Sequence, residues 1–197
     1  MEREIIVFDF DKTLTYKDTL LAFYVHVSPK SYRFPCKLLF YFFCMFLFKM
    51  KVISNNGLKI VGFNLFLKGL KNEYIEARSK AFSSRIKYNN LFKDFDFENK
   101  ERRIFIISAS FEVYLKYCFP DNVNVIGSKY CLSKKRAEKF TFNCYSSTKK
   151  KVLCKKGIDK IDVFFTDSFS DFSLAEVSKE INVVAGDKIV KMKSVAS

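Results

Sequence analysis

The chain lacks several features that mark common classes of protein. It has no tryptophan and a single histidine, and none of its six cysteines forms a CxxC pair. A structural zinc site is therefore not expected. His26 lies in an apolar helical stretch, so we interpret it as a packed or surface residue rather than a ligand. The N-terminus has no pattern typical of a cleavable signal peptide, which predicts a cytoplasmic protein with reduced thiols.

A long transmembrane run is also lacking. The uncharged segment Leu38–Phe48 is the most apolar part of the chain, but a full span needs about 20 apolar residues. We expect this segment to be either a core helix or an element at a membrane interface. The flanking Lys37, Lys49 and Lys51 suit the headgroup region of an anionic bilayer in the second case. The protein would then be peripheral to, or anchored in, the inner face of a membrane.

Acidic residues are in the minority, and this restricts the partners. The 197 residues carry a net charge of +14, which favours nucleic acid, an anionic membrane surface or a phosphorylated substrate. The basic clusters 134–136 and 149–151 have no interleaved aromatic residues and match no nucleic-acid motif, so nucleic acid is not expected. With 49% hydrophobic residues, the chain can bury a sizeable core.

The chain divides into a helical part and a part with alternating elements. Apolar runs predict five strands, at 5–8, 103–107, 123–127, 161–165 and 181–184. Periodic segments predict helices at 19–27, 58–70, 72–86, 111–118 and 148–156, and a further helix after residue 169. We expect a turn at 55–57, a helix cap at Asn72, a helix stop at Gly157 and either a small hairpin or an extended excursion at 129–142.

Strands that alternate with helices indicate right-handed βαβ units and a parallel sheet. The predicted fold is α/β, a Rossmann-like parallel sheet flanked by helices. The first strand belongs to this sheet, so the helical block is an insertion. We expect a core domain made of residues 1–15 and 100–197, and an inserted helical cap domain at 16–99.

Polar side chains follow three of the predicted strands. Asp9 and Asp11 come directly after the first strand, Ser108 follows the second, and Asp167 and Asp171 follow the strand at 161–165. Ligands of open α/β sheets bind beyond the carboxyl ends of the strands. Two carboxylates there are costly to hold without a cation or a reaction to serve. The sequence therefore predicts a site where these side chains converge.

This set of residues and its order resemble the haloacid dehalogenase (HAD) superfamily of phosphatases. Asp9-Phe10-Asp11-Lys12-Thr13 is similar to the first motif of the family, DxDx[TV]. Ser108 after an apolar run is similar to the second motif, Lys149 at a helix start to the third, and Asp167 with Asp171 to the fourth. The resemblance covers the predicted sheet domain at both ends of the chain. The helical insertion stands where the family carries its C1-type cap.

The resemblance implies a Mg²⁺-dependent phosphomonoester hydrolase with an aspartyl-phosphate intermediate. Asp9 would be the nucleophile and Asp11 the general acid and base. Ser108 and Lys149 would bind phosphate, although Ser108 as a helix cap, or Lys150 or Lys151 in place of Lys149, stay open. Thr13 would either donate its backbone N–H to the phosphate or orient the loop through its hydroxyl. The metal ligands implied are Asp9, Asp11 through its carbonyl, Asp167 and Asp171, the last directly or through water.

Within the superfamily the chain looks like the phosphoserine-phosphatase-like IB branch. Asn143-Cys144-Tyr145 before Lys149 fits this branch, and the apolar segment after the first helix is similar to that of the phosphatidylglycerophosphatase C enzymes. Lys12 stands where the family more commonly has glycine, and Ser146 stands where glycine often follows Asn-Cys-Tyr. The second departure makes the loop before Lys149 hard to predict.

The substrate is a separate question from the reaction. The apolar segment and the positive charge suggest a lipid phosphate such as phosphatidylglycerophosphate, and a soluble phosphomonoester such as phosphoserine is the alternative. A phosphotransferase is a further candidate, because an aspartyl-phosphate can pass to an alcohol. A non-catalytic binding protein on the same frame is the candidate of a different class, and the intact set of motif residues argues against it.

Overall fold

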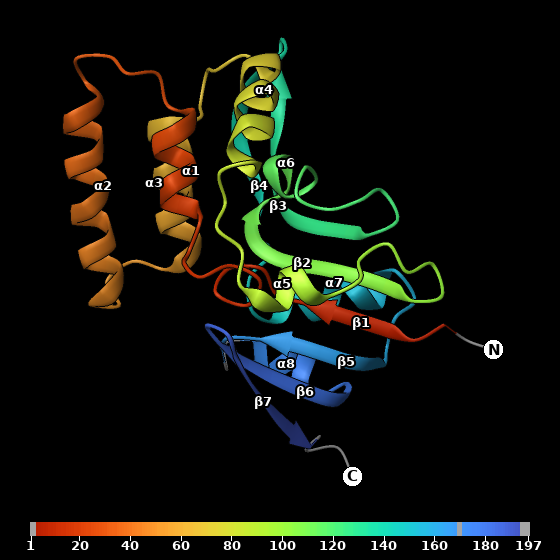
Figure 1. Ribbon diagram of the computed structural model, residues 1–197. Helices are drawn as coiled ribbons and strands as arrows, with labels where there is room; N and C mark the ends of the chain where they lie inside the picture. Colours follow the sequence, from red (N-terminus) through yellow and green to blue (C-terminus); the bar gives the residue numbers. More distant parts are fainter. Residues whose placement is uncertain (1–2, 169–170, 194–197) are drawn as a thin grey trace.

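The computed structural model describes residues 3–168 and 171–193. Its described part contains a seven-stranded sheet with the order β4-β3-β2-β1-β5-β6-β7 (Figure 1). The strands are β1 (Ile5–Phe8), β2 (Arg103–Phe111), β3 (Asn124–Ser133), β4 (Arg136–Phe142), β5 (Ile161–Thr166), β6 (Ser178–Ala185) and β7 (Lys188–Lys193). The inner pairs are parallel, while the edge strands β4 and β7 are antiparallel to their neighbours. The predicted parallel α/β sheet is confirmed, and β7 is an additional strand that the sequence did not indicate.

Alternation along the strands divides the core between the two faces of the sheet. In β1, Ile6 and Phe8 face one hydrophobic cluster, whereas Val7 faces the other. Leu153 of α7 (Ser147–Lys155) and Leu174 of α8 (Phe172–Ala175) pack on the Val7 face. Burying both faces is typical of a parallel sheet and accounts for the nearly continuous apolar runs of the inner strands.

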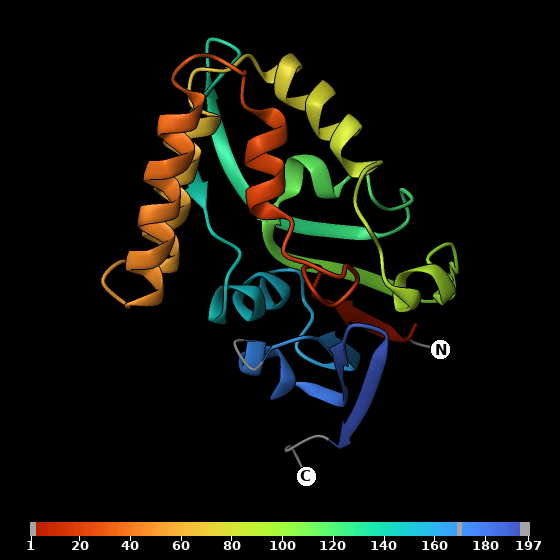
Figure 2. The same cartoon turned by 60° about the vertical axis from the view of Figure 1, so that its left-hand side comes forward.

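Five helices lie in sequence between β1 and β2. They are α1 (Leu20–Val27), α2 (Phe34–Lys49), α3 (Asn55–Phe66), α4 (Asn72–Ser83) and the short α5 (Asn90–Asp94). Figures 1 and 2 show α1 to α4 gathered beyond one end of the sheet, beside the β3–β4 hairpin. The predicted helical insertion is therefore present. Its division from the core at residues 15 and 100 stays a prediction.

The β3–β4 hairpin joins the inserted helices to the sheet. The ring of Phe63 in α3 lies 5.7 Å from that of Tyr130 in β3 and 6.4 Å from that of Phe140 in β4. The backbone N–H of Gly69 donates to the carbonyl of Ala137 at 2.7 Å. The hydrophobic cluster on this side of the sheet consequently continues into the helices without a break.

Two local predictions on the insertion are wrong. The turn expected at 55–57 is the first turn of α3, because the Ser54 hydroxyl accepts a hydrogen bond from the Gly57 N–H at 3.0 Å and caps the helix. Asn72 does not cap α4, whose N-cap is Lys71. The Asn72 side-chain oxygen instead accepts a hydrogen bond from the Tyr130 hydroxyl at 3.2 Å.

The strand that carries Ser108 is longer than expected. β2 continues to Phe111 after an irregularity in its pairing with β3, and the helix expected at 111–118 shortens to α6 (Glu112–Leu115). Gly157 ends α7 in the left-handed region with φ +73°, as predicted. The helix expected after residue 169 is α8, and residues 169–170 lie outside the described residues.

The apolar segment 38–48 lies within α2, and most of that helix is not core. Its buried residues are Tyr41 and Cys44. Leu39 is 73% exposed, and Phe40, Phe43 and Phe46 are each more than half exposed. Across the described ranges, no helix is both long enough and apolar enough to cross a membrane.

Candidate active site

A pocket of ≈ 220 Å³ opens at the carboxyl ends of β1, β2 and β5. Apart from Thr13, all of the predicted site residues line it: Asp9, Asp11, Ser108, Lys149, Asp167 and Asp171. The parallel pairing of β1 with both neighbouring strands places these strand ends at one edge of the sheet. Convergence at that edge is the arrangement expected for a ligand site in an open α/β sheet.

Lys149 connects the two carboxylates at the base of the pocket. Its Nζ lies 2.7 Å from Asp9 Oδ1 and 2.5 Å from Asp171 Oδ2, and the lysine is 2% exposed. Burial alone would lower the pKa of Lys149, but the charges of Asp9 and Asp171 outweigh burial and raise it. The ammonium is therefore fixed in its charged form beside Asp9.

The two neighbouring lysines do not take this place. Lys150 pairs with Glu176 at 3.3 Å on the surface, and Lys151 is exposed. Neither lines the pocket. The structure thus brings Lys149, rather than its neighbours, to the position that the third motif assigns.

Asp11 is held by hydrogen bonds to both of its oxygens. Oδ1 accepts from the Thr19 N–H at 2.7 Å and from the Thr19 hydroxyl at 2.6 Å, while Oδ2 accepts from the Ser110 hydroxyl at 2.5 Å. Burial, followed by the charge of Asp18, raises the pKa of Asp11 to about 7. A carboxyl group with such a pKa is suited to giving and taking a proton near neutral pH.

Ser108 and Thr13 differ in what they present to the pocket. Ser108 lines the pocket, and its hydroxyl oxygen accepts a hydrogen bond from the Ser110 N–H at 3.0 Å, which leaves the hydroxyl proton to be donated to a ligand. Thr13 does not line the pocket, and its N–H donates to the Phe10 carbonyl at 3.3 Å. The buried Thr13 hydroxyl has no hydrogen-bond partner within the described residues. A phosphate contact by Thr13 has no support in this geometry.

The carboxylates are crowded at one side of the pocket. Burial, followed by the charge of Asp9, raises the pKa of Asp167 to about 6. Among the residues that the structure describes, no three acidic, histidine or cysteine side chains converge as a complete metal cage. Mg²⁺ commonly takes one or two protein carboxylates and completes its shell with water and phosphate oxygens. Asp9 and Asp167 fit that requirement, since a divalent cation would relieve their repulsion.

Both departures from glycine occupy backbone conformations that glycine favours. Lys12 has φ +60°, and Ser146 has φ +52° with ψ −130°. The turn at Lys12 is stabilised by a hydrogen bond that the Lys12 N–H donates to the Thr15 hydroxyl at 3.0 Å. The family pattern therefore reflects a backbone requirement that this chain meets with other residues at some cost in strain.

Sequence reasoning missed a lysine of the insertion that reaches the pocket. Lys59 of α3 is 3% exposed, and its Nζ donates to the Ala109 carbonyl at 2.5 Å and to Asn143 Oδ1 at 2.6 Å. Burial lowers the pKa of Lys59 to about 8. Thr19 and Ser110, which hold Asp11, were missed as well. Ser110 belongs to the Ser-Ala-Ser segment that is similar to the family, but no local pattern predicts the contacts of these three residues, because their partners lie on distant segments.

The strand ends, the buried lysine and the clustered carboxylates define a hydrolase-type site on an α/β sheet. Residues 6–176 match the family described as haloacid dehalogenase-like hydrolase, so the chain belongs to that family. The predicted membership of the superfamily is thereby confirmed, and the chain is a hydrolase of this family. No curated protein matches the sequence.

Solved structures share the fold at low sequence identity. A protein of unknown function from Bordetella pertussis Tohama I has a TM-score of 0.70 at 13% identity, over 89% of this chain and 87% of that one. A substrate-bound phosphoserine phosphatase has a TM-score of 0.60 at 14% identity, over 92% and 85% of the two chains. A HAD family hydrolase from Salmonella enterica serovar Typhi has a TM-score of 0.62 at 14% identity. The match covers 89% of this chain but spans 60% of that longer protein.

Proposed function

We propose that the chain is a Mg²⁺-dependent phosphomonoester hydrolase that acts through an aspartyl-phosphate on Asp9. The observation that carries this proposal is the convergence of Asp9, Asp11, Ser108 and Lys149 on one pocket. The likeness in fold to phosphoserine phosphatase supports the same reaction class. A protein that had become a binding module would have no need to keep a buried lysine against two carboxylates, which is costly to maintain.

The reaction divides into two displacements at phosphorus. In the first, an Asp9 carboxylate oxygen attacks phosphorus and the ester oxygen leaves with the bonding pair, taking a proton from Asp11. In the second, Asp11 removes a proton from water, whose oxygen attacks phosphorus and releases Asp9 with inorganic phosphate. The Lys149 ammonium and the Ser108 hydroxyl would balance charge on the phosphoryl oxygens. Mg²⁺, when bound by Asp9 and Asp167, would offset the repulsion between the carboxylate and the phosphate dianion.

Replacing Asp9 tests the mechanism. We expect Asp9→Asn to abolish release of phosphate from an aryl phosphate and to abolish the phosphoenzyme that hydroxylamine traps in the wild type. Asp94→Asn is the matched control, because Asp94 is exposed at the end of α5, away from the pocket. Unchanged turnover by Asp9→Asn would refute the assignment of the nucleophile.

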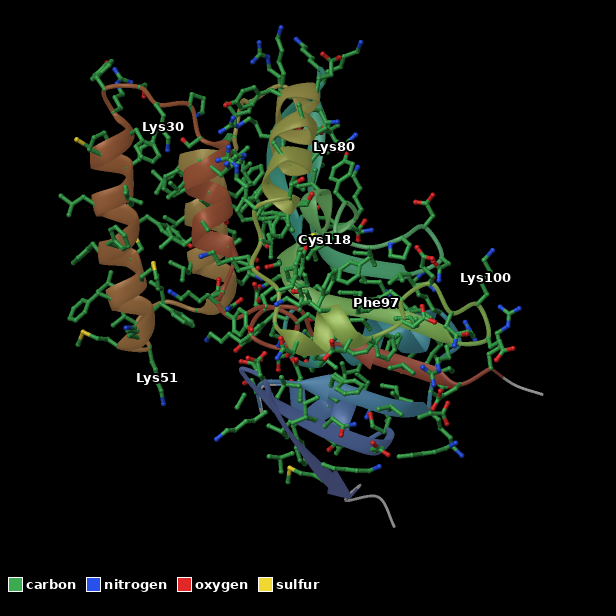
Figure 3. All side chains as sticks on the ribbon, viewed as in Figure 1. Lys30, Lys51, Lys80, Phe97, Lys100 and Cys118 are labelled. Atoms are coloured by element: carbon green, nitrogen blue, oxygen red, sulfur yellow. The ribbon has the colours of Figure 1, made fainter. Side chains whose placement is uncertain are left out.

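We also propose that the substrate is a lipid phosphate at an anionic membrane surface. No Asp or Glu lies between Asp18 and Glu73. The exposed apolar residues of α2, namely Leu39, Phe40, Phe43 and Phe46, recur at helical spacing on its outer side. Figure 3 shows that one side of α2 projects its side chains away from the other helices, with Lys30 and Lys51 near the two ends of α2. Apolar side chains between cations match the interface of an anionic bilayer.

The position of α2 relative to the pocket supports the same substrate class. The segment that follows α2 includes the exposed Met50 and Val52 and leads directly to Asn55, which lines the pocket. A bilayer in contact with α2 would therefore lie close to the pocket opening. Transfer of each half-exposed phenylalanine out of water is worth about 1 kcal/mol or more, and each basic residue near an anionic surface adds about 1 kcal/mol.

Flotation with vesicles tests the membrane contact. We expect the wild type to float with phosphatidylglycerol-containing vesicles but less with pure phosphatidylcholine, and we expect Phe43→Ser/Phe46→Ser to lose flotation while keeping activity on a soluble aryl phosphate. Leu132→Ser is the matched control, since Leu132 is 46% exposed on β3. Failure of the wild type to float, with full activity on soluble esters, would favour a soluble substrate such as phosphoserine. Loss of a dimer in the double variant would show that a second copy covers α2.

A further inference from the structure

Two linked hydroxyl groups, those of Tyr114 and Thr19, lead to Asp11. The Thr19 hydroxyl donates to Asp11 Oδ1 at 2.6 Å, and the same hydroxyl lies 2.7 Å from the Tyr114 hydroxyl. Thr19 is the N-cap residue of α1, and Tyr114 belongs to α6. Both are buried, Thr19 at 7% exposure and Tyr114 at 0%. The contact therefore joins the insertion, the sheet region and the proposed general acid.

The directions of the hydrogen bonds that link Tyr114, Thr19 and Asp11 follow from the single proton that each hydroxyl group carries. A threonine hydroxyl has one proton, and Thr19 gives it to Asp11. Tyr114 must therefore donate its own proton to the Thr19 oxygen. This donation holds the Thr19 hydroxyl in the orientation that serves Asp11.

The donors around Asp11 are distributed unequally between its oxygens. Each carboxylate oxygen has two acceptor positions. The N–H and hydroxyl of Thr19 fill both positions on Oδ1, whereas the hydroxyl of Ser110 fills one on Oδ2. Within residues 3–168 and 171–193, no further donor takes the second acceptor position of Oδ2, and Asp11 lines the pocket.

We propose that Thr19, oriented by Tyr114, is a positioning residue that confines the exchangeable proton of Asp11 to Oδ2 and so presents it to the leaving group. The inference rests on the proposed role of Asp11 as general acid and goes beyond it by assigning the proton to an atom and its control to two further residues. Proton transfer then requires that the insertion be docked, because Thr19 begins α1.

The packing around Tyr114 supports this coupling. Its ring lies 4.6 Å from that of Phe23 in α1 and 5.2 Å from that of Phe82 in α4. Figure 2 shows α6 between the sheet and α4, and the two helices are in contact. Movement of α1 or α4 would displace the Tyr114 hydroxyl and release Thr19 from its orientation.

The test compares esters whose leaving groups need a proton to different degrees. Phenolate is a poor leaving group that requires protonation, whereas dinitrophenolate leaves as the anion. General acid catalysis contributes about 10²–10⁴-fold, so we expect Thr19→Val to lower kcat/KM on phenyl phosphate about tenfold or more and on dinitrophenyl phosphate less than about twofold. The ratio kcat/KM is used because it covers the steps up to release of the phenol and is independent of hydrolysis of the phosphoenzyme.

Two further variants separate positioning from general loss of structure. Thr19→Ser keeps the hydroxyl and should restore activity on phenyl phosphate, and Tyr114→Phe should show a smaller loss with the same dependence on the leaving group. Thr141→Val, which removes an exposed hydroxyl on β4, should change neither rate. Thermal melts of each variant identify any loss of fold.

The outcomes distinguish this inference from the proposed function. An equal loss by Thr19→Val on both esters, no loss on either ester, or no recovery by Thr19→Ser would overturn the positioning role while the phosphatase stands. If the wild type hydrolyses neither ester, Asp11 has no acid role and both proposals fall together.

Discussion

Ser146 offers a direct test of the backbone strain beside the site. It precedes α7 with φ +52° and ψ −130°, a combination that glycine adopts readily and other residues avoid. Such a conformation costs a non-glycine residue about 1–3 kcal/mol. Replacement by glycine removes this cost but adds about 0.5–1 kcal/mol of conformational entropy in the unfolded chain. We therefore expect Ser146→Gly to stabilise the protein by about 1 kcal/mol.

The measurement is thermal and urea unfolding of the wild type and Ser146→Gly. For a chain of this size, 1 kcal/mol corresponds to a rise in Tm of about 2–4 °C. Gly157→Ala is the reciprocal control, because Gly157 has φ +73° and no atom lies within 4 Å of an added Cβ. Gly157→Ala should therefore lower the stability of the protein by about 1 kcal/mol, through the backbone conformation alone. An unchanged or lower Tm for Ser146→Gly would refute the argument from strain.

Two further predictions concern the core and the buried lysine. An added Cβ at Gly127 would lie within 3.0 Å of backbone atoms at the junction of β2 and α6, so Gly127→Ala should destabilise the fold by about 1–3 kcal/mol in urea unfolding; unfolding equal to that of the wild type would contradict this contact. Lys149→Met should abolish phosphatase activity and lower stability by about 3–5 kcal/mol, because it leaves two buried carboxylates unpaired. Lys150→Met should change both quantities little, and comparable losses in the two variants would contradict the distinction between these lysines.

The inner strands could be predicted because burial on both faces of the sheet requires a nearly continuous run of apolar residues in the sequence. β1 (Ile5–Phe8) is an apolar run followed by Asp9. β5 (Ile161–Thr166) is apolar except for Asp162 and its last residue, and both strands lie at the centre of the sheet. β7 lies exposed at an edge of the sheet, and its apolar residues are interspersed with lysines that include Lys188 and Lys191. It therefore has no continuous apolar run from which a strand could be predicted. Asn-Asn-Gly at 55–57 has turn propensity and so predicts a turn, but the Ser54 cap and packing against α2 favour a helix.

The site residues likewise fall into those that the sequence could predict and those that it could not. Asp9, Ser108 and Asp167 could be placed together because parallel strands bring their carboxyl ends to one edge. Thr19 and Lys59 could not be placed, since their roles depend on where the insertion docks. A sheet edge is defined by local pairing rules, whereas the docking of a helical insertion depends on the packing of many side chains at once.

The division of charge between the two parts of the chain bears on which ligands reach Asp9. The carboxylates gather at the sheet edge, where Lys149 neutralises part of their charge. The insertion contributes both Lys59 and Asp18 to the pocket, and it carries no acidic residue between Asp18 and Glu73. A phosphate that approaches along residues 19–72 therefore meets basic residues and no carboxylate until it reaches Asp18 at the pocket, and these cations reduce the repulsion that the pocket carboxylates exert during the approach. On this argument, neutralising basic residues of the insertion should slow binding of phosphate esters more strongly at low ionic strength than at high ionic strength.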